Sequence, residues 1–196
     1  TVISSEVLLR WKHPHLGSVN PAEFIPIAEE NDFISELGLW VCNEACKLLS
    51  ECQSLKIKTK LSVNISAKHL ARADFVSKFV ATVNRWRVPH KELTLELTEG
   101  ALIRGVSIIQ RRVRELAEHG FSLSIDDFGI GDSNLNYLQD LPITELKVDR
   151  VFIEAMEGSQ QKTLLVTSIC NMAKALHLNT VAEGIETTGQ LDQAKD

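Results

Sequence analysis

The sequence lacks any apolar run long enough to cross a membrane, and no signal-peptide pattern precedes its first predicted strand. We therefore expect a cytoplasmic domain, with a membrane anchor upstream of this sequence as the alternative. Positive charge is also in deficit, since 21 Lys and Arg residues stand against 26 Asp and Glu residues, for a net charge of −5. This balance argues against binding to a nucleic-acid polymer, but local cations or metal ions could still attract a small anion within a cleft.

Cysteine patterns typical of metal or redox sites are missing too. The chain has four cysteines and no Cys-x-x-Cys, and Cys42 and Cys46 lie four residues apart in a predicted helix. We expect them to be free, buried thiols. The six histidines are scattered. His13-Pro14-His15 is interpreted as a polar loop, with half of a metal site as the alternative.

Strands and helices alternate along the whole chain, without repeats, low-complexity segments or linkers. The predicted strands cover residues 2–11, 60–66, 93–99, 121–127, 144–149 and 179–184. The predicted helices cover residues 21–31, 34–53, 73–86, 106–120, 133–141 and 161–178. A loop with His-Pro and a glycine follows the first strand. This alternation predicts one α/β domain over residues 1–196, with a parallel sheet covered by helices.

The predicted strands carry one apolar and one polar face. In residues 60–66, Leu61 and Val63 alternate with Ser62 and Asn64, and the later strands repeat this pattern. A doubly wound sheet has helices on both faces, so its strands should be apolar throughout. A (β/α)₈ barrel instead turns apolar residues outward to the helices and polar residues inward. Since such a barrel typically has about 250 residues in eight strand–helix units, we expect a barrel that lacks one strand at each end of this chain.

Each predicted strand delivers a polar side chain near its carboxyl end, except the first, which carries its carboxylate in mid-strand. The set is Glu6, Asn64, Glu96, Asp126, Asp127, Lys147 and Glu183. Strand-end residues of one barrel converge, and carboxylate and amide oxygens favour Mg²⁺ or Mn²⁺ over zinc. The number of carboxylates predicts two ions, about 3.5–4 Å apart, with one of the adjacent aspartates bridging them. For any single acidic residue, the alternative is a helix N-cap or a solvated loop charge.

Eight motifs, in this order along the chain, resemble the EAL domain family: EVLLRW, HPHLG, PAEFIPIAE, SVNIS, LELTE, IDDFGIG, LKVDR and AEGIET. The resemblance covers essentially the whole chain. It implies a modified TIM (β/α)₈ barrel, here truncated at both ends relative to the family. It also implies a phosphodiesterase that hydrolyses cyclic-di-GMP to linear pGpG in bacterial second-messenger signalling. Val7 replaces the alanine of the family signature, an apolar exchange that leaves Glu6 in place.

Matching positions imply roles for individual residues. The implied metal ligands are Glu6, Asn64, Glu96, Asp126, Asp127 and Glu183. The implied catalytic residues are Asp126, Lys147, which holds the attacking water, and Glu183, a general base. The implied substrate contacts are Arg10, at a phosphate, with Leu8 and Asp149. Glu99 is implied to anchor the loop of residues 127–133, and Glu186 to support the site. The alternatives are a surface charge for Arg10 and a helix-initiating acid for Glu99.

The loop after the adjacent aspartates departs from the family pattern. Ile130 stands where active members usually have threonine, and Asp132 and Asn134 are also unusual. The isoleucine removes a hydroxyl group but no metal ligand. The exchange is therefore compatible with lower or differently regulated activity.

The resemblance also implies cofactors and partners. The cofactors are two Mg²⁺ or Mn²⁺ ions, with Ca²⁺ inhibitory. The partners are cyclic-di-GMP, a second copy of the chain, and a sensor or GGDEF domain upstream in the full-length protein. The homodimer would involve the helix after VDRVF and residues 133–141, whose apolar side chains could equally pack in the core: Leu135, Tyr137, Leu138 and Leu141.

Two other functions are alternatives to the phosphodiesterase. A catalytically weak or inactive domain could act as a cyclic-di-GMP receptor or as a protein-binding module. Receptors of this kind typically lose metal ligands, whereas this chain keeps every ligand that its length can show. An unrelated Mg²⁺-dependent barrel enzyme lacks support, because no Gly-rich phosphate loop follows a late strand.

Overall fold

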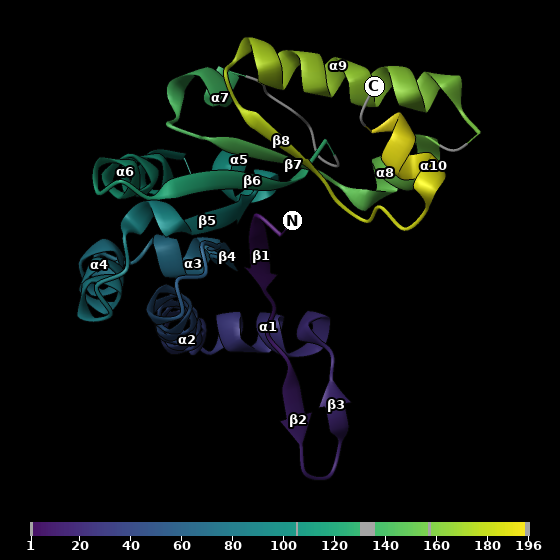
Figure 1. Ribbon diagram of the computed structural model, residues 1–196. Coiled ribbons are helices and arrows are strands. Elements are labelled where there is room, and N and C mark those ends of the chain that lie inside the picture. The colour runs from purple at the N-terminus through teal and green to yellow at the C-terminus, as the bar shows by residue number, and fades with distance from the viewer. Residues whose placement is uncertain (1, 105, 130–135, 157, 195–196) are drawn as a thin grey trace. The chain divides into compact units, whose positions relative to one another are not determined.

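A computed structural model describes residues 2–104, 106–129, 136–156 and 158–194 (Figure 1). The chain divides into two compact units. Unit 1 comprises Thr1–Glu96 and Gly105–Ser122, and unit 2 comprises Leu97–Arg104 and Leu123–Asp196. No helix among the described residues is long and apolar enough to span a membrane.

The main sheet has six strands. They are β1 (Ser4–Val7), β4 (Lys60–Asn64), β5 (Leu93–Thr98), β6 (Ser122–Phe128), β7 (Glu145–Val148) and β8 (Asn179–Ala182), and their order in the sheet is β1-β4-β5-β6-β7-β8. The pairs β1·β4, β4·β5, β6·β7 and β7·β8 are parallel. A doubly wound sheet reverses its strand order at a switch point, and this sheet does not. The predicted barrel-type α/β fold is therefore confirmed.

Unit 1 places helices around β1, β4 and the start of β5. They are α1 (Pro21–Glu30), α2 (Ile34–Ser54), α3 (Ala67–Leu70), α4 (Phe75–Arg85) and α6 (Val106–Glu118), with a 3-10 turn, η1, at His90–Glu92. Helix α1 begins where the sequence indicates, because Asn20 Oδ1 accepts a hydrogen bond from Ala22 N at 3.0 Å and Pro21 is the first helical residue. Cys42 and Cys46 of α2 are buried free thiols, as predicted.

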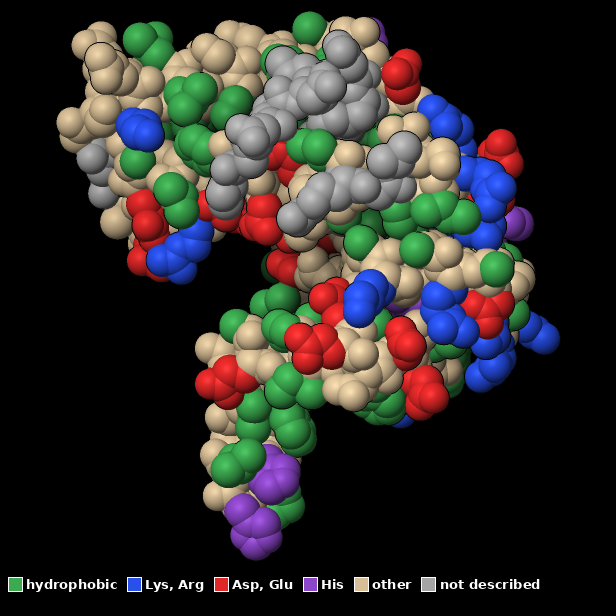
Figure 2. All heavy atoms as spheres, turned by 180° about the vertical axis from the view of Figure 1, so that it is seen from behind, with side chains coloured by type: hydrophobic (Ala, Val, Ile, Leu, Met, Phe, Trp, Pro, Cys, Tyr) green, Lys and Arg blue, Asp and Glu red, His purple; other side chains and the backbone are tan. Residues whose placement is uncertain are grey.

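The segment after β1 differs from the prediction. The first strand ends at Val7, and a separate antiparallel hairpin, β2 (Trp11–His13) with β3 (Gly17–Val19), replaces the expected loop. The hairpin carries imidazole side chains at its tip (Figure 2). His13 Nδ1 accepts hydrogen bonds from the backbone nitrogens of His15 and Leu16, both at 3.2 Å, so the neutral ring carries its proton on Nε2. Because Nδ1 of His13 is already occupied by two backbone donors of the turn, the hairpin accounts for this side chain without a metal ion.

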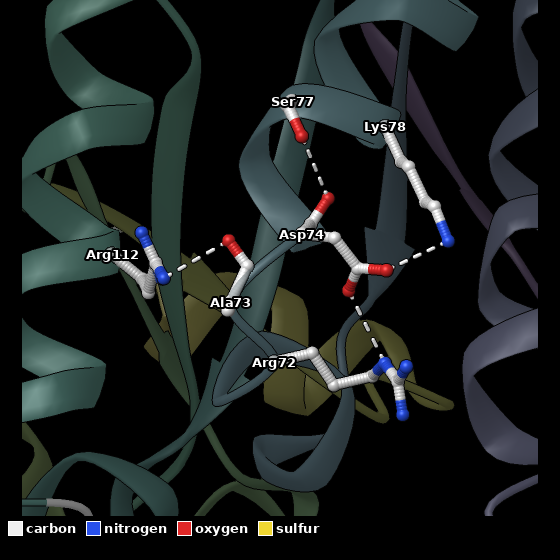
Figure 3. A network of polar contacts seen from close by, with 6 residues as sticks. All are labelled: Arg72, Ala73, Asp74, Ser77, Lys78 and Arg112. Carbon is white, nitrogen blue, oxygen red and sulfur yellow. Dashed lines mark hydrogen bonds and ion pairs between the residues drawn. The ribbon is translucent and has the colours of Figure 1, made fainter.

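Polar contacts fix the start of α4 (Figure 3). The Asp74 carboxylate binds Arg72 Nε at 3.3 Å and Lys78 Nζ at 2.7 Å, while Arg112 Nη2 donates to the carbonyl of Ala73 at 3.1 Å. Beside this network lies a pocket of about 340 Å³ that Phe33, Phe75 and the buried His69 help to line. None of the residues predicted to bind metal or substrate lines this pocket.

Unit 2 places its helices around β6, β7 and β8. They are α5 (Glu99–Arg104), α7 (Asn136–Asp140), α8 (Arg150–Met156), α9 (Gln160–Ala175) and α10 (Thr188–Gln193). The sequence prediction missed α3, α5, α8 and α10, each of which has four to seven residues. Two turns of helix are too few to show an apolar periodicity.

The alternation along the strands holds in the structure. The apolar positions of β5, β6 and β7 are almost fully buried: Leu93, Leu95, Leu97, Leu123, Ile125, Leu146 and Val148. On the opposite face, Glu96, Ser124 and Lys147 are 2%, 0% and 5% exposed, so the polar face is covered as well. Buried polar groups are costly unless they are paired, which makes this face the place to look for function.

Candidate active site

The polar residues of unit 1 form a first cluster, which consists of Glu6, Asn64 and Glu96. Asn64 and Glu96 are register partners on β4 and β5, and Ile65 N donates to the carbonyl of Glu96 at 2.9 Å. Register partners in a parallel pair place their side chains on the same face of the sheet. Asn64 Nδ2 donates to Glu6 Oε1 at 2.7 Å, so β1 delivers its carboxylate to the same place. The structure therefore brings the three predicted ligands of this unit together.

The polar residues of unit 2 form a second cluster, which consists of Asp126, Asp127, Lys147 and Glu183. Lys147 Nζ lies 2.6 Å from Glu183 Oε1 and 3.1 Å from Asp126 Oδ1. The lysine side chain is 6% exposed, against 14% for Asp126 and 26% for Glu183. An ammonium group this well buried requires paired carboxylates, because an isolated buried charge is strongly unfavourable. Strands β6 and β7, with the end of β8, thus present a linked carboxylate–ammonium–carboxylate group.

A β-bulge sits at the two adjacent aspartates. Ile125 pairs with Leu146 and Phe128 pairs with Val148, so β6 uses one more residue than β7 over the same stretch. Asp127 has φ of +55°, in the left-handed region. Neighbouring side chains of a regular strand point to opposite faces, and a bulge redirects one of them. The strained backbone of Asp127 is therefore part of how this strand ends with two acidic side chains.

Asp127 lies in an excess of negative charge. Although the residue as a whole is exposed, partial desolvation of its carboxyl group raises its pKa, and the carboxylates of Asp126 and Asp149 raise it further. Lys147 opposes these effects without cancelling them. A group whose charged form is disfavoured by neighbouring carboxylates is stabilised in that form by a cation. The charge of this cluster therefore favours binding of a cation.

The donor atoms of both clusters fit Mg²⁺ or Mn²⁺, since they are carboxylate and amide oxygens. Among the described residues, no three His, Cys, Asp or Glu side chains already surround a common point. Three contacts occupy donor atoms of the clusters: Lys147 engages Asp126 and Glu183, and Asn64 directs its amide nitrogen at Glu6. Ligation through the oxygen of Asn64 would require the amide to turn over, a rotation that exchanges nitrogen for oxygen at little cost.

The residues expected to support the site also lie in unit 2. Glu99 is 2% exposed, and its Oε2 accepts a hydrogen bond from Gly129 N at 3.0 Å, which ties it to the start of the loop after Asp127. Asp149 Oδ1 accepts from Val151 N at 2.7 Å and so caps α8. Glu186 is exposed and follows β8. Asp149 therefore has a structural contact beside its electrostatic influence on Asp127.

The structure corrects the placement of Arg10. The prediction put Arg10 on the same strand face as Glu6, but β1 ends at Val7. Arg10 lies in the segment between β1 and β2, where it is exposed and its Nη1 donates to the carbonyl of Leu9 at 2.8 Å. Leu8, in the same segment, is 53% exposed. Strand alternation thus gives no support to a role of Arg10, whose assignment as a substrate contact rests on the family motif.

The altered loop residues Ile130, Asp132 and Asn134, together with Leu135, fall outside the described residues. Of the predicted dimer contacts that can be located, Leu138 and Leu141 are 4% and 5% exposed. These two leucines pack in the core, as the alternative interpretation held.

A contact that the sequence prediction missed supports Asn64. Ser66 caps α3 by accepting from Lys68 N at 3.2 Å, and its hydroxyl donates to Glu29 Oε1 of α1. Lys68 Nζ donates to the carbonyl of Glu29 at 2.8 Å. These bonds attach the chain just beyond Asn64 to α1. A serine directly before a short helical stretch is an N-cap signal, but no sequence pattern identifies its partner on α1.

Comparison with known proteins shows which family this chain resembles. Residues 1–196 match the EAL domain. The chain is 40% identical over 190 residues to the cyclic di-GMP phosphodiesterase NbdA of Pseudomonas aeruginosa. The aligned residues cover 95% of this chain and 24% of that protein. It is 37% identical over 191 residues to the oxygen sensor protein DosP of Escherichia coli. This alignment covers 97% of this chain and 24% of that protein.

A solved structure shows the same fold. The PaMucR phosphodiesterase in complex with c-di-GMP superposes with a TM-score of 0.91 at 35% identity, over 97% of this chain and 77% of that one. The chain spans only 24–31% of the length of curated relatives such as DosP. The family match over the whole chain and the identity to these relatives show that the chain belongs to the EAL domain family.

Proposed function

We propose that this domain is a metal-dependent phosphodiesterase that hydrolyses cyclic-di-GMP to linear pGpG. The observation that carries the proposal is the second cluster, where buried Lys147 joins Asp126 to Glu183 beside a charge-crowded Asp127. The names of relatives support the substrate, since NbdA is a cyclic di-GMP phosphodiesterase and PaMucR was solved with c-di-GMP.

Water attacks one phosphorus of the dinucleotide in line with the 3′-oxygen. The bond from phosphorus to the 3′-oxygen breaks, and this oxygen takes up a proton from the solvent to become a 3′-hydroxyl. Glu183 takes the proton of this water, and Lys147, 2.6 Å from its carboxylate, keeps Glu183 in place and polarises the water. One oxygen of the new 5′-phosphate of pGpG therefore comes from water. Arg10, Leu8 and Asp149 contact the substrate, Arg10 at a phosphate.

Both clusters supply metal ligands in this proposal. Glu6, Asn64, Glu96 and Asp126 hold one Mg²⁺ or Mn²⁺ ion, and Asp126, Asp127 and Glu183 hold a second. When bound, the two ions neutralise the charge that develops on the phosphate oxygens. Glu99 holds the loop after Asp127 through Gly129, and Glu186 supports the site.

The assembly is also proposed. A homodimer would form around residues 133–141 and the helix after VDRVF, which is α9 in the structure. Because Leu138 and Leu141 are buried, its contacts must come from other side chains. The chain covers only a small part of the length of relatives such as DosP. A sensor or GGDEF domain upstream of this domain is consistent with that small part. Sedimentation at tens of micromolar tests the dimer, since about 7 kcal/mol of association free energy would already hold it there.

The second candidate function is a receptor that binds cyclic-di-GMP without cleaving it. Asp126→Asn separates the two, because it keeps the shape of the side chain and removes a charge that faces Lys147 at 3.1 Å. For the enzyme, we expect hydrolysis to fall by several orders of magnitude while dinucleotide binding changes much less. For a receptor, the wild type does not hydrolyse, and the substitution changes affinity alone. Calorimetry and product chromatography on both proteins decide between these results.

A further inference from the structure

We propose that Gln190 is a positioning residue for Glu183. It holds the segment Glu183–Thr187, through which β8 runs into α10, so that Glu183 stays against Lys147. The inference rests on the proposed function, because it concerns the residue proposed as metal ligand and base. Gln190 itself contacts neither substrate nor metal in this proposal.

The buried amide of Gln190 makes two hydrogen bonds to this segment. Its side chain is 5% exposed, and its Oε1 accepts from Glu186 N at 2.7 Å and from Thr187 N at 3.1 Å. In return, Thr187 Oγ1 accepts from Gln190 N at 3.1 Å. The bonds between Thr187 and Gln190 form a capping box at the start of α10. The bond to Glu186 goes beyond a capping box, since it reaches one residue further toward Glu183.

The other end of the segment is fixed by unit 2 itself. Glu183 N donates to the carbonyl of Val148 at 3.0 Å, which continues the β7–β8 ladder by one residue. Gly184 has φ of +69°, and a Cβ atom there would lie 2.5 Å from Cβ of Arg150. The backbone at Gly184 therefore packs directly on the first turn of α8. Ladder and close packing hold the segment where it leaves β8, and Gln190 holds it where α10 begins.

The buried amide of Gln190 is consistent with a role beyond capping α10. A helix of six residues has little stability of its own, and burial of an amide is unfavourable unless its polar atoms are paired. Helix α10 also contacts α8, the helix on which Gly184 packs. The buried glutamine therefore ties the residues after Glu183 to a packed part of unit 2. Groups hydrogen-bonded to a metal ligand typically change metal affinity or activity by about 10–100-fold when they are removed. Gln190 acts on Glu183 through the backbone that follows it, so we expect an effect at the lower end of this range.

The test compares three variants of the full chain. Gln190→Met keeps the length and burial of the side chain but removes the carbonyl acceptor. Gln190→Glu keeps an oxygen that can accept both bonds. Gln193→Ala, on the exposed face of the same helix, is the matched control. Mn²⁺ binding, followed by electron paramagnetic resonance without substrate, is measured together with the kcat and KM of cyclic-di-GMP hydrolysis.

We expect Gln190→Met to weaken Mn²⁺ binding and lower kcat, each by about tenfold or more, with KM changed less. Gln190→Glu should restore most of both, and Gln193→Ala should match the wild type. Equal Mn²⁺ affinity and kcat in Gln190→Met and Gln193→Ala would overturn the inference. If the wild type binds Mn²⁺ but hydrolyses nothing, a loss of Mn²⁺ affinity in Gln190→Met still supports positioning while the proposed function fails.

Hydrogen exchange on the wild type gives a test that needs no variant. The amides of Glu186 and Thr187 should be protected from exchange, because both donate to Gln190 Oε1. Exchange of these two amides at the rate of an unstructured chain would show that Gln190 does not hold the segment, and the inference would then be wrong even if Gln190→Met did not fold.

Discussion

Lys147 Nζ lies 2.6 Å from Glu183 Oε1, and only 6% of the lysine side chain is exposed. The same nitrogen lies 3.1 Å from Asp126 Oδ1. This lysine therefore compensates the charge of two carboxylates that the proposed reaction needs in their ionised form. Its removal should affect catalysis directly, and stability to a smaller extent.

Lys147→Met tests this relationship. We expect kcat to fall by about 10²–10³-fold, the range seen when a single donor at a reaction centre is removed. Lys78→Met is a matched control, because Lys78 pairs with the exposed Asp74 at 2.7 Å and lies outside the proposed site. Steady-state kinetics with circular dichroism on both variants separate lost catalysis from lost structure. A Lys147→Met protein that is folded and as active as Lys78→Met would refute the role of Lys147.

Replacing Mg²⁺ by Ca²⁺ tests the metal requirement. Ca²⁺ also prefers oxygen ligands, but it binds them at longer distances and in looser geometry. We therefore expect cyclic-di-GMP to bind in Ca²⁺ while turnover is suppressed. Calorimetry and product chromatography in each ion make the comparison, with a chelator as the metal-free control. Equal turnover in both ions would argue against a metal-activated nucleophile.

Glu99 offers a test of the loop anchor. Its Oε2 accepts from Gly129 N at 3.0 Å in a buried position. Glu99→Leu removes this acceptor, and we expect at least a tenfold loss of kcat (about the lower end for a residue that supports a metal ligand). Glu99→Gln keeps an accepting oxygen and should lose much less. If the two variants are equally impaired, the charge of Glu99 matters rather than its bond to Gly129.

The buried imidazole of His69 predicts how stability depends on pH. Burial lowers the pKa of His69 to about 4, from an ordinary value of 6.5. Below pH 6.5 the unfolded chain binds a proton that the folded protein does not, so stability should decrease as the pH falls from 6.5 toward 4. The slope from this group approaches about 1.4 kcal/mol per pH unit. Above pH 6.5 this group no longer contributes to the pH dependence of stability.

Urea unfolding between pH 7 and pH 4.5 measures this contribution. His69→Gln should show a shallower loss of stability than the wild type, even if it is less stable at pH 7. His15→Gln, on the exposed tip of the hairpin, should follow the wild-type curve. Parallel curves for all three proteins would mean that His69 is protonated in the folded state as readily as in the unfolded state.

Strand alternation was the most informative part of the sequence. Leu95 and Ile125 are buried on one face, and Glu96 and Lys147 lie on the other, so period-two patterns located both the core and most of the polar clusters. The same reasoning was wrong for Arg10, because it assumed that the first strand runs on past Val7. Hydrophobic residues continue beyond that point, and tertiary pairing alone decides where the strand ends.

Features set by only a few residues escaped prediction. The hairpin of β2 and β3 depends on Gly17, with φ of +72°, in strands of three residues each. The bulge at Asp127 cannot be recognised from the sequence, because two adjacent acidic residues occur equally well in a loop. Gln190 and the contact of Ser66 with Glu29 depend on partners whose positions exist only in the folded chain.

Incubation of the full-length protein with cyclic-di-GMP and Mg²⁺ in ¹⁸O-labelled water tests the proposed reaction most directly. Mass spectrometry should detect pGpG with one ¹⁸O atom in its 5′-phosphate, and no product in the presence of a chelator. Intact cyclic-di-GMP after hours, with a folded and metal-loaded protein that binds the dinucleotide, would contradict hydrolysis and identify the domain as a receptor.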